Sequence, residues 1–167
     1  MNKVTMNGNP LSLEGNLPNI GDSIKDFTLK TVELSDKTAK DYENKVLVIV
    51  AVPSIDTPVC DLEIQKFNTE AGSLSDDIKI VGVSADLPFA QARWATERNI
   101  KNIEMLSDYM TMDFAKNYGI LIKELRLTAR AIFVYDKSGK LSYMELVSEI
   151  KNEPNYSKAI EAAKNAL

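Results

Sequence analysis

The sequence predicts an α/β fold with a mixed central sheet flanked by helices. Three apolar runs rich in β-branched residues, 45–52, 78–84 and 129–135, have the composition of strands that are buried on both faces of a sheet. Amphipathic segments with helical spacing lie between them. With 167 residues, 44% hydrophobic and 26% charged, the chain has the length and composition of a single globular domain covering 1–167.

The N-terminal residues are predicted to form a β-hairpin extension, assigned to 1–14. Asn7-Gly8-Asn9-Pro10 separates the short runs 4–6 and 11–13, and Asn-Gly readily supplies the two positive φ values of a tight turn. Residues 15–23 contain two glycines and a proline and are predicted to form a loop. Short edge strands are predicted at 27–29 and 32–34.

Four helices are predicted after the first core strand. Pro88 opens the second helix, which Asp86 or Leu87 caps, and Gly119 ends the third. The four helices span 58–71, 88–98, 112–118 and 156–166. In the first helix, the apolar residues Val59, Leu62, Ile64 and Phe67 alternate with the polar residues Asp61, Glu63, Lys66 and Asn68.

The remaining strands complete the predicted sheet. A short strand is expected at 103–106, and a turn at 136–139 leads from the third core strand into an antiparallel partner at 140–147. The chain therefore ends with helix, strand, strand and helix, which is the signature of a thioredoxin-like fold.

Cys60 is the most plausible reactive residue. It is the only cysteine, and the chain contains no histidine. Cys-His and Ser-His-Asp arrangements and imidazole metal sites are therefore excluded, and one cysteine cannot form an internal disulfide. We expect no metal and no cofactor.

The residues before Cys60 predict a helix start. Thr57 is a suitable cap and Pro58 a suitable first residue, which places Cys60 in the first turn, where free N–H groups and the helix dipole favour an anion. A free thiol has a pKa near 8.5, and lowering it to roughly 6 requires about 3.4 kcal/mol. A helix end supplies at most about 2 kcal/mol. A cation is therefore needed, and without histidine it must be arginine or lysine.

Arg130 is the best candidate for that cation. It stands second in an otherwise apolar predicted strand, and burying a guanidinium there is costly unless an anion faces it. Arg126, in a predicted loop, and Arg93, on a polar helix face, are weaker candidates. Two alternatives stay open. Cys60 can be an inert buried residue of a non-catalytic binding module, or the chain can be a thiol transferase, although Thr57 stands where a Cys-x-x-Cys motif has its first cysteine.

Pro53-x-x-x-Thr57-x-x-Cys60 resembles the peroxidatic-cysteine motif of the peroxiredoxins, and the string from Pro53 to Cys60 resembles their bacterial thiol peroxidase branch. Two further blocks, 84–91 and 129–131, fit the same branch. The resemblance implies that Cys60 attacks a hydroperoxide and becomes sulfenic acid. It also implies that Thr57 orients the thiolate and the peroxide, that Arg130 stabilises the thiolate, and that Pro53 shields the site.

Ala95 is the departure from this family. The resemblance places the resolving cysteine there, just after Trp94, so this chain is either a natural one-cysteine variant or carries a substitution.

The family further implies hydrogen peroxide or an alkyl hydroperoxide as substrate, thioredoxin or another thiol as reductant, and a homodimer. The net charge of -4 without a basic block argues against nucleic acid, and the short apolar runs argue against a membrane span. We expect a cytoplasmic location.

Overall fold

The computed structural model describes residues 3–167 and contains a seven-stranded mixed sheet. β6 pairs in parallel with β7, and β7 with β8, whereas β4, β5, β11 and β12 join by antiparallel pairing. In spatial order the strands are β12 (Leu141–Leu146), β11 (Ala131–Tyr135), β6 (Val46–Ala51), β7 (Ile78–Ser84), β8 (Glu104–Ser107), β4 (Thr28–Thr31) and β5 (Asp36–Thr38).

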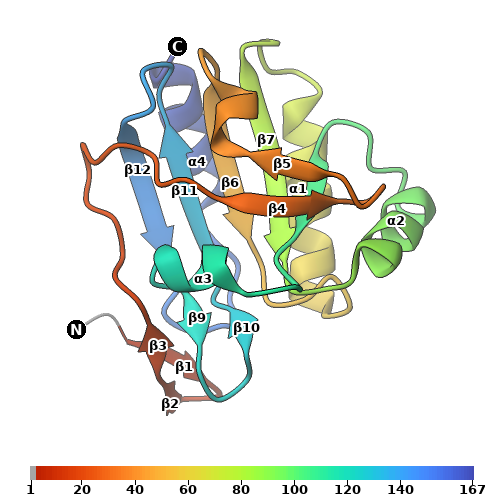
Figure 1. Ribbon diagram of the computed structural model, residues 1–167, viewed down its shortest axis with the longest axis vertical. Helices are drawn as coiled ribbons and strands as arrows, with labels where there is room; N and C mark the ends of the chain where they lie inside the picture. The colour runs from red at the N-terminus through yellow and green to blue at the C-terminus, as the bar shows by residue number, and fades with distance from the viewer. Residues whose placement is uncertain (1–2) are drawn as a thin grey trace.

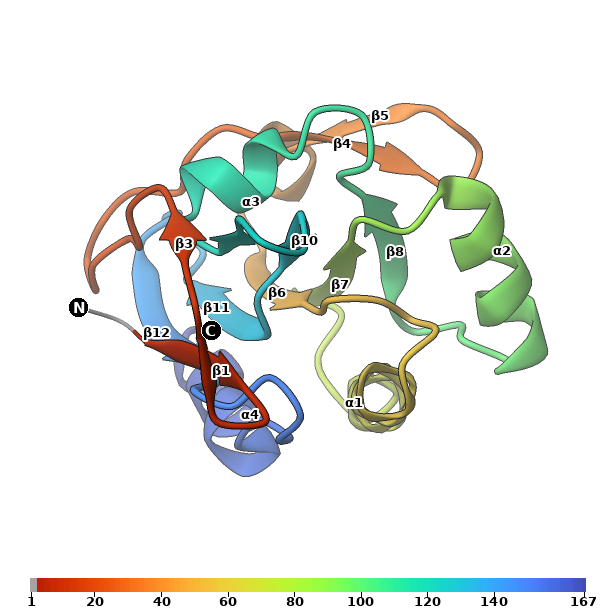
Figure 2. The same ribbon diagram turned by 90° about the horizontal axis from the view of Figure 1, so that it is seen from below.

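Helices lie on both sides of this sheet (Figures 1 and 2). α1 (Pro58–Ala71) and α4 (Tyr156–Asn165) lie on one face, α3 (Asp113–Asn117) lies on the other, and α2 (Pro88–Glu97) lies at the side of β8 (Figure 2). A 3-10 turn, η1 (Ala39–Tyr42), leads from β5 toward β6. This arrangement confirms the predicted mixed sheet flanked by helices.

β6 explains why the predicted core strands are so apolar. Leu47 and Ile49 belong to the buried cluster on the α3 side, whereas Val48 and Val50 belong to the cluster with α1 and α4. All six residues of the strand are buried. A strand with helices on both sides has no exposed face, so it carries no polar alternation.

The N-terminal hairpin forms, but its second strand starts earlier than predicted. β1 (Val4–Met6) pairs with β2 (Asn9–Leu11) around a two-residue turn in which Asn7 and Gly8 have φ values of 52° and 78°. Pro10 therefore lies inside a strand, which an edge strand tolerates. Met1 and Asn2 of the assigned extension 1–14 lie outside the described residues.

Several predicted boundaries are corrected. The edge strands predicted at 27–29 and 32–34 lie at 28–31 and 36–38 because residues 32–35 form the connecting turn, with Leu34 at φ 68°. The third core strand begins at Ala131, so Arg130 immediately precedes it. Three two-residue strands were not predicted: β3 (Leu13–Glu14), β9 (Leu121–Ile122) and β10 (Leu127–Thr128), which form a separate small sheet. Other ends differ from the prediction by one or two residues.

Within 3–167, no helix is long and apolar enough to cross a membrane.

Candidate active site

Cys60 lies in the first turn of α1, as predicted from Thr57 and Pro58. The Thr57 side chain caps the helix, because its Oγ1 accepts a hydrogen bond from the Cys60 N–H at 3.4 Å. The same hydroxyl donates to the Ser54 carbonyl at 3.0 Å, which fixes its orientation. Cys60 itself has 0% exposure. The sulfur is therefore held beside the positive end of a helix dipole and away from bulk water.

Arg130 supplies the cation at this sulfur. Its Nη2 lies 3.4 Å from the Cys60 Sγ, and the residue is 1% exposed. Two further hydrogen bonds, from Nε at 3.1 Å and from Nη2 at 2.9 Å, run to the carbonyl of Ile150 and hold the guanidinium in place. Burial lowers the pKa of Arg130, but its acidic neighbours Glu63 and Cys60 outweigh that effect and raise the pKa above its ordinary value. The site therefore contains a permanent positive charge.

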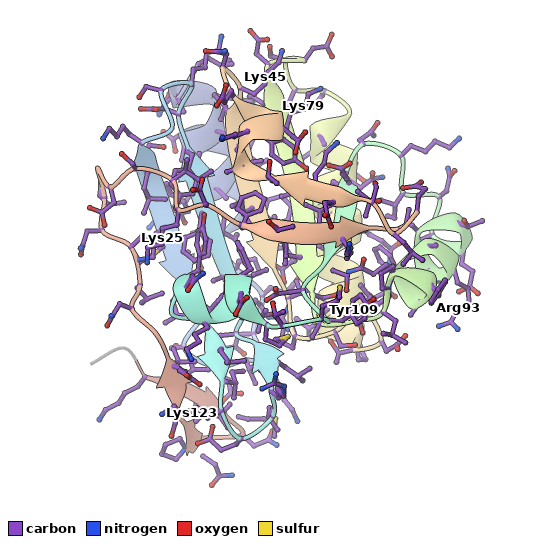
Figure 3. The ribbon with its side chains drawn as sticks, in the orientation of Figure 1. Lys25, Lys45, Lys79, Arg93, Tyr109 and Lys123 are labelled. Carbon is purple, nitrogen blue, oxygen red and sulfur yellow. The ribbon has the colours of Figure 1, made fainter. Side chains whose placement is uncertain are left out.

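The two weaker candidates lie elsewhere. Arg93 projects from α2 with a 63% exposed side chain and approaches Glu97 at 4.0 Å, and Figure 3 shows it on the outer side of that helix. Arg126 lies at φ 52° in the tight turn between β9 and β10, with its N–H bonded to the Ile122 carbonyl. The structure brings only Arg130, of the three, into hydrogen-bond distance of the sulfur within the described residues.

Glu63 is part of the site although the sequence reading assigned it to the polar helix face. It is 0% exposed, and its Oε2 lies 2.5 Å from the Arg130 Nη1. The buried face of α1 consists of Cys60, Glu63, Ile64 and Phe67, while Leu62, assigned to the apolar face, is 44% exposed. Burial raises the pKa of Glu63 to about 7, against the opposing effect of Arg130. The i, i+3, i+4, i+7 spacing from Cys60 was the signal that could have identified it.

Asp86 holds the loop that carries Pro53 and Thr57. Its carboxylate accepts hydrogen bonds from the Ser54 hydroxyl at 2.7 Å and from the Ile55 N–H at 2.9 Å. Pro53 is buried in this loop, two residues after the end of β6. Asp86 and Leu87 were the two predicted candidates for the N-cap of α2. The structure has Leu87 at that position, so the side chain of Asp86 can bind the loop. Nothing in the sequence indicates this role, because the hydrogen-bonded partners are about thirty residues apart in the chain.

Asp61, the residue after Cys60, joins α1 to α2. Its carboxylate accepts hydrogen bonds from the Trp94 Nε1 at 2.8 Å and from the Arg98 Nε and Nη2 at 2.9 Å each. Partial burial would raise the pKa of Asp61, but these donors hold it below its usual value. Ala95 follows Trp94 on α2, is half-buried, and packs against the apolar cluster that contains Cys60. The two helices are thus tied together next to both positions.

This geometry is suited to nucleophilic chemistry at sulfur. A helix N-terminus and a buried guanidinium both favour a thiolate, and hydrogen-bond donors already in place can stabilise charge that develops along a reacting bond. A thioredoxin-like sheet that presents such a cysteine at the start of a helix, with a guanidinium at the sulfur, is the arrangement expected of a cysteine-dependent peroxidase of the peroxiredoxin class.

The chain belongs to the AhpC/TSA family, whose model matches residues 20–144. It is 48% identical over 164 residues to a thiol peroxidase of Bacillus subtilis, covering 98% of both chains. It is 47% identical over 167 residues to a thiol peroxidase of Halalkalibacterium halodurans, covering 100% of both chains. The activity class of the chain is therefore that of a peroxiredoxin-type thiol peroxidase.

Solved structures agree with this assignment. A peroxiredoxin-like protein from Aquifex aeolicus superposes with a TM-score of 0.94 at 38% identity and covers 100% of this chain and 98% of that one. A thiol peroxidase from Chromobacterium violaceum superposes with a TM-score of 0.87 at 23% identity, covering 98% and 95%, which supports the fold.

Proposed function

We propose that Cys60 is the peroxidatic nucleophile and that Thr57, Arg130 and Pro53 complete its site. The observation that carries this assignment is the 3.4 Å contact between the Arg130 Nη2 and the Cys60 Sγ in a buried setting. Since the guanidinium cannot lose its proton, its positive charge faces the sulfur at any physiological pH. The thiolate attacks the terminal oxygen of hydrogen peroxide or an alkyl hydroperoxide, water or alcohol leaves, and Cys60 becomes sulfenic acid.

The remaining residues position this reaction. The hydroxyl of Thr57, oriented by the Ser54 carbonyl, lies where it can exchange hydrogen bonds with a bound peroxide. Arg130 stabilises both the thiolate and the charge that moves onto the peroxide oxygens. Pro53 keeps water from the sulfur, a role supported by its burial beside the loop that leads into α1.

An external thiol recycles the sulfenic acid. Cys60 is the only cysteine, so no second thiol of this chain can form an intramolecular disulfide, and Ala95 occupies the position of the family's resolving cysteine. Thioredoxin or a small thiol must therefore attack the sulfenic acid directly. If that reductant is scarce, further oxidation to sulfinic acid competes.

Residues 1–167 act as one domain, assemble as a homodimer and work in the cytoplasm. The homodimer is supported by the exposed Leu87 and Phe89 at the start of α2 and by the exposed Met110 in the turn after β8, since both segments follow the ends of the neighbouring parallel strands β7 and β8. A reducing compartment suits a protein whose one cysteine must remain a thiol. Light scattering at several protein concentrations measures the assembly, and a monomer at all of them would contradict the dimer.

Peroxide consumption with a thiol reductant tests the assignment. The parent chain should consume hydrogen peroxide and form sulfenic acid on Cys60, and Cys60→Ser should abolish both. Thr57→Val should slow the reaction while leaving the chain folded, because it removes one hydroxyl at the surface of the site. No peroxide loss and no mass change at Cys60 would exclude this cysteine as the nucleophile and would favour the inert-cysteine alternative.

A further inference from the structure

The guanidinium of Arg130 faces two acidic groups. It contacts the Cys60 Sγ on one side and the Glu63 Oε2 on the other, and none of the three residues is more than 1% exposed. A buried charge needs a buried partner, because removing an ion from water is expensive. One cation can compensate one anion. A site with both a thiolate and a carboxylate would retain an uncompensated negative charge.

Two charge-balanced states are available to this cluster. In the first, Glu63 is a carboxylate and Cys60 a thiol. In the second, Cys60 is a thiolate and Glu63 a carboxylic acid. Both states contain Arg130 as a cation, and they differ only in the location of one proton. Such groups titrate as a pair and not as independent sites.

The surroundings of Glu63 favour the state in which it carries the proton. Its second oxygen, Oε1, has no hydrogen-bond partner among the described residues. An unpartnered buried oxygen is much less costly on a neutral acid than on a carboxylate. The other groups that face it are Glu145 on β12, Glu153 in the loop before α4, and Tyr156, the first residue of α4. Lys66 of α1 is paired with Glu153. Burial and these acidic groups raise the pKa of Glu63 to about 7 although Arg130 opposes them.

We infer that Glu63 holds the single acidic proton of the Cys60–Arg130–Glu63 cluster whenever Cys60 is a thiolate. Glu63 is thus a positioning residue that leaves the charge of Arg130 available to the sulfur, in a chain that has no histidine for this purpose. The inference rests on the proposed role of Cys60 as the nucleophile and extends it.

The proton balance of the reaction then closes within the cluster. Before attack, the S–H bond of Cys60 breaks and an O–H bond forms on Glu63. The sulfur attacks the terminal peroxide oxygen, so the S–O bond forms, the O–O bond breaks, and the sulfur loses two electrons that the peroxide gains. The hydroxide or alkoxide that leaves takes up one proton, the one that Glu63 releases. Glu63 gives up its own proton, because the thiolate charge is gone, and ends as a carboxylate paired with Arg130.

Proton release during alkylation tests the inference without using peroxidase activity. Iodoacetamide converts the thiolate to a neutral thioether and releases iodide. In weakly buffered solution at slightly acidic pH, the parent chain should be alkylated rapidly and should release about one proton per Cys60, from Glu63. Slow alkylation with the same release would place that proton on the Cys60 thiol and overturn the inference. Glu63→Gln keeps the size of the side chain and should be alkylated rapidly with almost no proton release, since its thiolate has already lost the proton to solvent. Glu70→Gln, an exposed site on the same helix, is the matched control and should match the parent.

Infrared spectroscopy provides a second measurement that does not depend on a variant at Glu63 folding. The reduced parent should show the carbonyl band of a protonated carboxylic acid, and Cys60→Ser should lose it, because Glu63 then pairs with Arg130 as a carboxylate. Rapid alkylation of the parent without proton release, or no such band, would overturn the inference. Failure of the parent to consume peroxide would instead overturn the proposed function, and the proton measurement would still stand.

Discussion

Replacing Arg130 by methionine should destabilise the protein in a strongly pH-dependent way. The substitution removes the one cation that faces Cys60 and Glu63, so both groups must be neutral and the folded variant holds one more proton than the folded parent. Keeping a carboxyl of ordinary pKa 4.5 protonated costs about 3 kcal/mol at about pH 7 and less than about 1 kcal/mol at about pH 5. The lost hydrogen bonds to the Ile150 carbonyl add about 1–3 kcal/mol at either pH.

The sign of this dependence follows from the protons bound. Above about pH 4.5 the folded variant binds one proton that the unfolded variant has released, so the free energy of unfolding decreases as the pH rises. Relative to the parent, the loss should be about 4–6 kcal/mol at about pH 7 and about 2–4 kcal/mol at about pH 5.

Urea unfolding of the parent, Arg130→Met and Arg130→Met with Glu63→Met measures these differences. The double variant should lose the pH-dependent part of the penalty, because a buried ion pair can be replaced by apolar side chains at little cost in stability. It should nevertheless lack peroxidase activity. A penalty that is equal at both pH values, or one that Glu63→Met does not relieve, would refute the electrostatic account of this pair.

Three further changes test other parts of the structure. Ala95→Cys should form a reducible disulfide with Cys60 after peroxide treatment, and only free thiol in non-reducing mass spectrometry would contradict this. Gly15→Ala should lower the urea midpoint more than Gly8→Ala. Both glycines have a positive φ, which strains an alanine by about 1–3 kcal/mol. A Cβ at Gly15 would also lie 1.8 Å from a backbone oxygen, whereas a Cβ at Gly8 would meet no atom within 4 Å. Equal losses would contradict this. Burial raises the pKa of Asp108 from 3.8 to about 6, so the parent should lose thermal stability as the pH rises through that range, and Asp108→Asn should not. Parallel stability curves would contradict this.

Local chemistry made the reactive cysteine and its cation predictable. Thr57 and Pro58 mark a helix start through capping and a fixed φ, and these effects act within a few residues. Arg130 was identifiable because a guanidinium beside apolar β-formers needs an anion, although it lies just before the strand and not inside it. Both signals are properties of short segments.

The parts of the site that the sequence reading missed depend on contacts between distant segments. Glu63 looked like an ordinary polar helix residue, and its burial follows from which side of α1 meets the sheet and α4. The Ile150 carbonyl and the carboxylate of Asp86 act through partners on other elements. Two-residue strands such as β9 and β10 are too short for any periodic pattern to reveal.

The N-terminal hairpin reaches the active centre through the segment that anchors the guanidinium. The Thr5 N–H donates to the Ser148 carbonyl at 2.7 Å, and the Ile150 N–H donates to the Thr5 carbonyl at 2.9 Å. The carbonyl of the same residue, Ile150, accepts the hydrogen bonds from Arg130. Removing β1, or fusing an affinity tag close to it, would therefore weaken the hydrogen bonds that position the Arg130 side chain, although Arg130 lies on a different element. The opposite terminus, where Leu167 is 52% exposed beyond α4, is the better place for such a fusion.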